Sequence, residues 1–169
     1  RDGELEEKLK TRHGLKMPIP KDYQLAMEGE DFTWLRWELK EASNSIVVAD
    51  KPLEPGNRFN QLFRWRNSVT KAIESGNEDS YMTIDTAYFD VKKRKMTIGG
   101  YQVYELKGLW EMENDFMGGP FVSYMFVDEA RGRMILIDGF TYAPGTDKKQ
   151  YVRQFEALVT GAEPITPGS

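Results

Sequence analysis

The chain has 169 residues, of which 40% are hydrophobic and 30% charged, with no cysteine and a net charge of −4. This length suits one folded domain, and the composition differs from that of disordered chains. The acidic balance and the lack of a long basic block argue against nucleic acid as a partner. The absence of cysteine excludes disulfides and thiolate-bound metals.

The first 50 residues predict a short helix followed by an antiparallel meander. Asp2 can cap a helix over about residues 3–13, and Gly14 ends it. The prolines of Met17–Pro20 require an extended backbone. Alternation over Phe32–Leu39 places aromatic side chains on both faces of a strand. The expected strands cover residues 23–28, 32–39 and 45–49, the last one short.

A second helix is predicted from an apolar stripe with spacings of three and four, capped by Gly56 or Asn57 and ending near Ser75–Gly76. Trp65 is expected to broaden its packed face. Beyond it, short strand-like segments at residues 80–90 and 96–98 flank a basic run, Lys92–Lys95, which is interpreted as a solvated turn. The stripe consists of Phe59, Leu62, Phe63, Arg66, Val69 and Ile73.

The second half predicts three long strands, near residues 101–112, 121–127 and 133–142, and a closing helix that Thr146 or Asp147 caps and Gly161 ends. Residues 1–161 should form a single α+β domain, with a loose tail at residues 162–169. This order favours an antiparallel β-sheet covered by helices. It is similar to the α/β/α sandwich shared by PsbP and Mog proteins, a resemblance that concerns the fold alone.

Chemistry-bearing motifs are sparse. His13 is the one histidine, and its place at a helix end suits a cationic imidazole on the helix dipole better than a general base. The segment Glu113–Asp115 lacks the remaining donors of a calcium loop. Gly118–Pro120 leads into a strand and so lacks the helix amides that hold phosphate. No metal and no cofactor is predicted.

Three carboxylates leave one enzymatic function possible. Glu105, Glu111 and Asp138 lie on predicted strands that can be neighbours, as a two-carboxylate hydrolase of glycan or peptide requires. Placement on the solvent side of the sheet explains them more simply. We therefore expect a non-catalytic protein, with the carboxylate hydrolase as an alternative.

Aromatic residues provide the stronger lead, because the chain holds 4 Trp, 8 Tyr and 9 Phe, more than one core of this size needs. Some should face a ligand or partner. The predicted contact residues are Trp34, Arg36, Trp110, Phe116 and Met117. The last two belong to the loop Asp115–Pro120, which either plugs the sheet or meets a partner.

Several segments together resemble one uncharacterised family. They are FTWLRWE at Phe32–Glu38, FRWRNSVTK at Phe63–Lys71, DSYMT at Asp79–Thr83, KGLWEMENDFMGGPFVS at Lys107–Ser123 and GFTYAP at Gly139–Pro144. The family comprises lipoproteins of Bacteroidetes grouped as a domain of unknown function, and the resemblance, from about Leu15 to Ala162, is to the C-terminal half of longer members.

The resemblance implies a cell-envelope location, periplasmic or surface-exposed, with a lipid anchor that precedes this chain in the full-length protein. It carries no activity, ligand or catalytic residue. The expected function is a module that binds an envelope protein or ligand, with no nucleic acid partner and with membrane association through the anchor alone. A structural half-domain that packs against a missing N-terminal half is a further alternative.

Overall fold

The computed structural model describes residues 1–168, apart from 41, 72–81, 86–90, 113–117 and 143–148. The described elements follow the predicted order of helix, strands, helix, strands and helix. They are α1 (Gly3–His13), β1 (Leu15–Lys16), β2 (Gln24–Glu28), β3 (Phe32–Glu38), β4 (Ser43–Pro52), α2 (Arg58–Thr70), β5 (Met82–Asp85), β6 (Lys92–Ile98), β7 (Tyr101–Met112), β8 (Gly118–Asp128), β9 (Arg133–Tyr142), α3 (Lys149–Thr160) and β10 (Glu163–Pro164).

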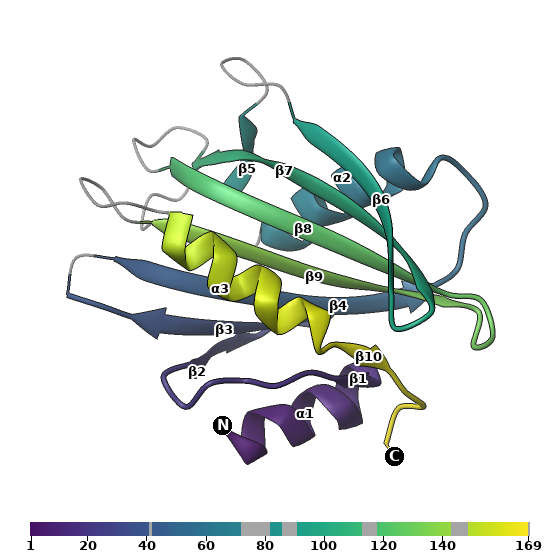
Figure 1. Cartoon of the computed structure of the whole chain (residues 1–169), viewed down its shortest axis with the longest axis horizontal. Helices are drawn as coiled ribbons and strands as arrows, with labels where there is room; N and C mark the ends of the chain where they lie inside the picture. The colour runs from purple at the N-terminus through teal and green to yellow at the C-terminus, as the bar shows by residue number, and fades with distance from the viewer. Residues whose placement is uncertain (41, 72–81, 86–90, 113–117, 143–148, 169) are drawn as a thin grey trace.

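Within the described residues, eight strands form one sheet in the order β2-β3-β4-β9-β8-β7-β5, and β6 also pairs with β7. Every pairing is antiparallel. Helix α3 crosses one face of the sheet and α2 covers the other, while α1 lies beside the β2–β3 end (Figure 1). The predicted α+β class, with an antiparallel sheet covered by helices, is confirmed.

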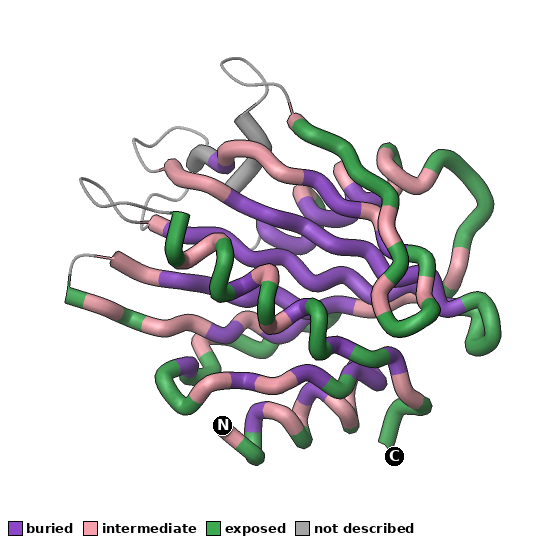
Figure 2. The backbone as a smooth tube through the Cα atoms, viewed as in Figure 1, coloured by how far each residue is buried: buried purple, intermediate pink, exposed green. Residues whose placement is uncertain are grey.

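The hydrophobic core consists of two clusters, one on each face of the sheet. On the α3 face, Phe155 and Val159 join residues of α1 and of the central strands. On the α2 face, Leu62, Trp65 and Val69 pack against the other side of those strands. Figure 2 shows the result as a band of buried backbone along β8, β9 and β4, the strands in the middle of the sheet. The predicted packing of Trp65 in the core is confirmed.

Local capping explains where the first two helices begin. The Asp2 carboxylate accepts hydrogen bonds from the amides of Glu4 and Leu5, and Gly14 ends α1 with a φ of 60°. The Asn57 side chain accepts from the amide of Asn60 at the start of α2. Helix α2 ends at Thr70, earlier than predicted; the predicted end and the caps proposed for α3 lie outside the described residues.

Two predictions about the strands need correction. Lys92–Lys95 is the first half of β6 and not a turn: its residues pair with β7, where Arg94 contacts Glu105 and Lys95 lies over the Tyr104 ring. Lysine-rich strands are well suited to a sheet edge, because their charge opposes pairing with another chain. Strand β4 spans Ser43–Pro52, ten residues instead of the predicted five, because it pairs with all of β9.

The expected loose tail at residues 162–169 is wrong for its first part. β10 pairs with β1, Ala162 is buried, and the Ile165 amide donates to the Gly14 carbonyl at 2.8 Å. The Arg133 guanidinium donates to the carbonyls of His13, Gly14 and Ile165, so it joins the end of α1 to the C-terminal segment. Among the described helices, none is long and apolar enough to cross a bilayer.

Candidate functional site

Two of the predicted contact residues, Trp34 and Arg36, lie next to one another on the α2 face of β3. The Arg36 guanidinium lies 5.0 Å from the centre of the Trp34 ring, and its Nε is 2.7 Å from Glu38 Oε1. Trp34 is half-buried, and its indole nitrogen has no hydrogen-bond partner among the described residues. The neighbouring residue on β2, Met27, is 41% exposed. This pair therefore remains accessible to a partner.

The third predicted residue, Trp110, belongs to the core. Its side chain is 2% exposed, its indole N–H donates to the Thr141 carbonyl at 3.2 Å, and its ring meets Phe140 edge-on. Gly119, opposite Trp110, makes this possible, because a Cβ there would lie 2.0 Å from the Thr141 oxygen. The prediction that Trp110 faces a ligand is not supported by this burial. Phe116 and Met117 lie outside the described residues.

Two of the three predicted carboxylates, Glu105 and Asp138, do not form a pair. Asp138 faces α2, where its Oδ1 accepts from Arg66 Nε at 2.9 Å, and both side chains are fully buried. Glu105 faces α3, beside Tyr124 of the cluster on that side. The two carboxylates thus lie on opposite faces of the sheet, which rules them out as a catalytic pair. The side chain of Glu111 is not described.

Glu105 is also not the solvent-facing residue that the sequence suggested. It is buried, and Arg94 from β6 reaches it at 3.2 Å. Burial raises the pKa of the Tyr124 hydroxyl, and the hydrogen bond of that hydroxyl with Glu105 raises it further. The arrangement is a satisfied ion pair between an edge strand and the core, so it serves the fold.

His13 lies in a buried joint between α1 and the sheet, instead of on an exposed helix end. Its Nδ1 is 2.7 Å from Asp50 Oδ1 and its Nε2 is 2.8 Å from Thr33 Oγ1. Hydroxyl, imidazole and carboxylate stand in the order of a nucleophile, base and orienting acid. Thr33 is fully buried, however, and Arg12 also donates to its hydroxyl at 3.2 Å, so no substrate atom can approach it. We assign this triad a structural role.

A hollow beside α3 is the strongest candidate for a ligand site. We call it the α3 groove; it has a volume of about 310 Å³, near the lower end of small-molecule pockets. Its floor is apolar, and charged side chains form its rim. The floor consists of Leu109, Pro120 and Val152, and the rim of Lys149, Arg153 and Glu156.

The local structure explains how the groove arises. Leu109 and Pro120 are direct neighbours on β7 and β8, and they face α3. Val152 stands on the flank of the helix, one turn before Phe155, whose ring packs against Gly139. A Cβ at Gly139 would lie 2.6 Å from that ring, so the glycine allows the helix to approach the sheet closely at this point. The floor remains open along the β7 side of α3.

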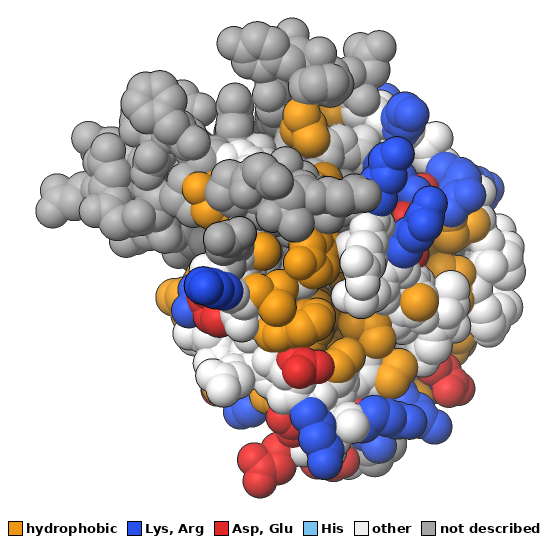
Figure 3. Space-filling view, turned by 60° about the vertical axis from the view of Figure 1, so that its left-hand side comes forward, with side chains coloured by type: hydrophobic (Ala, Val, Ile, Leu, Met, Phe, Trp, Pro, Cys, Tyr) orange, Lys and Arg blue, Asp and Glu red, His pale blue; other side chains and the backbone are white. Residues whose placement is uncertain are grey.

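Charge on the rim is biased toward cations. Lys149 and Arg153 lie on successive turns of α3, and Glu156, the acidic member, is paired with Lys107 of β7 at 3.1 Å. In Figure 3, hydrophobic side chains gather in the middle of the face that looks toward the viewer, with Lys and Arg side chains at several places around them. An apolar floor with a cationic rim fits a ligand that has an apolar body and an anionic group.

None of these groove residues was predicted as a site. The sequence shows the signal in part, since Val152 lies among apolar residues spaced by three and four in the closing helix, and Lys149, Arg153 and Glu156 follow its flank. Such spacing alone indicates a buried face and not a ligand site. Leu109 and Pro120 come together in the groove through the pairing of β7 with β8, which the sequence alone does not predict.

The architecture defines the class: a domain with one antiparallel sheet between helices, similar to the solution structure of cyanobacterial PsbP (CyanoP) from Synechocystis sp. PCC 6803. That match has a TM-score of 0.59 and 12% identity, and covers 91% of this chain and 88% of the other. LpqN, involved in cell envelope biogenesis of Mycobacterium tuberculosis, matches with a TM-score of 0.49 and 12% identity, over 86% and 79%. No curated protein matches the sequence. At such identities, the likeness to PsbP concerns the fold.

More particularly, the chain belongs to the family described as Domain of unknown function (DUF4837), which matches residues 2–161. The predicted membership of an uncharacterised family is thereby confirmed. The Bacteroidetes origin and the lipid anchor stay predictions.

Proposed function

We propose that this chain is a non-catalytic binding module of the cell envelope, which holds an amphipathic anionic ligand in the α3 groove. The observation that carries the proposal is the combination of an apolar floor of Leu109, Pro120 and Val152 with a cationic rim. The envelope location and a lipid anchor in the full-length protein rest on the resemblance to lipoproteins. Binding, and not catalysis, is favoured because the candidate carboxylates face opposite sides of the sheet.

The ligand class follows from the two parts of the groove. The floor offers no side-chain hydrogen-bond donor or acceptor, so the part of the ligand that it covers should be hydrocarbon. Arg153 is exposed at the rim, where its guanidinium can donate to a carboxylate or phosphate. A fatty acid or a similar chain with an acidic head combines both properties.

A fluorescence titration with dansyl-undecanoic acid tests this proposal. Val152→Asp puts a carboxylate on the apolar floor and should weaken binding at least tenfold, because the ligand chain would meet a charge. Gln154→Asp is the matched control: it adds the same charge to the exposed side of the same helix and should change affinity less than about twofold, since a screened surface charge away from the ligand contributes about 0.4 kcal/mol or less.

The rim is tested separately. Arg153→Gln should weaken binding of the acid about three- to tenfold, as expected for loss of one solvent-exposed hydrogen bond that contributes about 1 kcal/mol, while the corresponding dansyl-labelled alcohol should bind the wild type and this variant alike. Absence of saturable binding to the wild-type protein, or equal weakening by Val152→Asp and Gln154→Asp, would contradict the proposal. Circular dichroism must show that each variant is folded.

A second candidate surface is the pair Trp34 and Arg36, which fits a protein partner. α2 packs against β5, β7, β8 and β9 and leaves this part of β3 accessible. Among the described residues, the exposed large hydrophobic side chains are Leu25 and Met27 of β2. Met27 lies opposite Trp34, whereas Leu25 lies opposite Leu35 on the other face. This is a small surface, and so it favours a local contact over the half-domain alternative, which needs a large open apolar face.

A further inference from the structure

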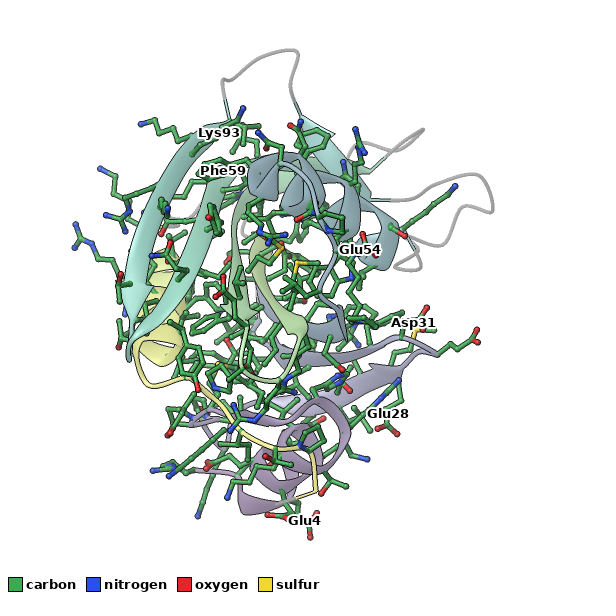
Figure 4. All side chains as sticks on the ribbon, turned by 90° about the vertical axis from the view of Figure 1, so that its right-hand side faces the viewer. Glu4, Glu28, Asp31, Glu54, Phe59 and Lys93 are labelled. Carbon is green, nitrogen blue, oxygen red and sulfur yellow. The ribbon has the colours of Figure 1, made fainter. Side chains whose placement is uncertain are left out.

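Strand β6 presents its basic residues on two different faces of the sheet. Lys92 pairs in register with Lys107, and Arg94 with Glu105, and both partners face α3. Lys95 contacts Tyr104, whose ring meets Phe59 of α2, so Lys93 and Lys95 belong to the opposite face. In Figure 4, Lys93 stands at one end of β6, and nitrogen-tipped side chains project outward along this strand.

On the α3 face, this strand extends the cationic rim of the groove into a larger surface, which we call the basic α3 face. In the part of the chain that the structure describes, this face contains more basic than acidic side chains, although the whole chain has a net charge of −4. The basic members are Lys92, Arg94, Lys107, Lys149 and Arg153, and the acidic ones are Glu105 and Glu156.

The acidic members are already engaged. Glu105 is buried against Arg94, and Glu156 pairs with Lys107. Lys92 and Arg153 have no ion-pair partner among the described residues. Lys92 also stands directly opposite Lys107, a like-charge arrangement that costs stability within a sheet and that a nearby anion would relieve. The surface is therefore complementary to a negatively charged partner.

We propose that the basic α3 face docks on an anionic lipid bilayer, with the α3 groove opening toward the lipid. This inference rests on the proposed function, because it gives the source of an amphipathic anionic ligand. A lipid surface fits better than an acidic protein for one reason: the cations border an apolar hollow, so headgroups and a hydrocarbon chain are recognised side by side. The contact differs from the lipid anchor, since it is made by the folded domain.

Co-sedimentation with vesicles tests the docking. The protein should bind vesicles of phosphatidylglycerol and phosphatidylcholine at low salt, bind pure phosphatidylcholine vesicles at least tenfold more weakly, and dissociate as salt is raised. Lys92→Glu should weaken partitioning about 10- to 30-fold, because each basic charge near an anionic surface contributes about a factor of five. Lys93→Glu is the matched control on the other face of the same strand and should weaken it less than about threefold.

The results distinguish this inference from the proposed function. Neither β6 variant changes the groove, so both should bind dansyl-undecanoic acid in solution as the wild type does. Val152→Asp should lose the probe and weaken vesicle binding by about fivefold, less than Lys92→Glu does, because it adds one negative charge to the face and does not reverse a positive one. Equal weakening of vesicle binding by Lys92→Glu and Lys93→Glu overturns the proposal, and so does equal binding to neutral vesicles. Binding to poly-glutamate with the same difference between the variants, but not to vesicles, would show an acidic protein as the partner instead.

Discussion

The two faces of the sheet hold their helices by different means, and adjacent residues of β9 show the difference. Asp138 points to α2 and binds Arg66, an ion pair with both members fully buried. Gly139 points to α3 and leaves room for the Phe155 ring. The α2 face is thus fixed by a specific charge pair. At Gly139, the contact between α3 and the sheet depends on shape complementarity alone, and the α3 groove lies on this face.

Removal of one charge from the buried pair on the α2 face should lower the stability of the fold more than any other change. Asp138→Asn takes the carboxylate from the buried Arg66 guanidinium and should lower the free energy of unfolding by about 3–5 kcal/mol, as for other broken buried pairs. Urea denaturation measures this effect. Ser123→Ala is the control, since Ser123 is the direct neighbour of Asp138 on β8, and its buried hydroxyl has no hydrogen-bond partner among the described residues.

The Ser123→Ala control should be neutral or slightly stabilising. The double variant Arg66→Met with Asp138→Val should recover most of the stability lost in Asp138→Asn, because it removes both charges and changes the total volume little. If Asp138→Asn were as stable as the wild type, the α2 face would not depend on this pair.

The α3 face should respond to added volume. Gly139→Ala places a methyl group against Phe155 and should cost about 1–3 kcal/mol, the usual penalty of overpacking. Displacement of α3 in Gly139→Ala should also alter probe binding in the groove. Asp138→Asn, if it is still folded, should bind the probe nearly as the wild type does. Combined thermal and titration measurements would test this. Unchanged stability in Gly139→Ala would show that α3 can shift freely on the sheet.

The smallest expected effect is a pH dependence that originates from the α3 face. Burial raises the pKa of Tyr23, which packs in the cluster on that face, to about 12. Because the pKa is higher in the folded state than in the unfolded chain, the neutral Tyr23 hydroxyl makes its full contribution to stability below pH 10, the ordinary tyrosine value. This contribution is lost as pH rises toward 12. The loss attributable to Tyr23 should be about 1 kcal/mol by pH 11.

Urea unfolding of the wild type and of Tyr23→Phe at pH 8 and pH 11 would measure this loss. The variant should lose less stability between these pH values than the wild type. Parallel losses in the two proteins would show that the Tyr23 hydroxyl does not titrate in the folded state differently from the unfolded chain.

The parts of this fold that could be predicted are those set by local pattern. Large apolar residues between glycine-containing turns predict the three long strands, and spacing in the second predicted helix places Arg66 on its buried side. The partner of Arg66 lies 72 residues further on, so no local pattern connects the two. The basic run at Lys92 was misread for a related reason: exposed lysines are common to turns and edge strands, and pairing with β7 decides between them.

The candidate site was predictable to a smaller extent. The excess of aromatic residues, with aromatic side chains on both faces of the strand at Phe32–Leu39, predicts Trp34 and Arg36, and the structure places the two side chains together. Trp110 is also a tryptophan, but it is buried against Gly119 and the Thr141 carbonyl, a tertiary contact that the sequence does not reveal. The α3 groove requires the register of β7 on β8, and so it appears in the folded chain alone.

The contact of Arg133 with both ends of the chain bears on the order of folding. Its guanidinium binds the His13 carbonyl across a separation of 120 residues, and β1 pairs with β10, close to the end of the chain. On a ribosome, α1 is made before the strands of the sheet, yet the groups that hold its C-terminal end are made after most of them. Closing so long a loop is entropically costly, so the first helix should dock in a late step, after the central sheet has formed.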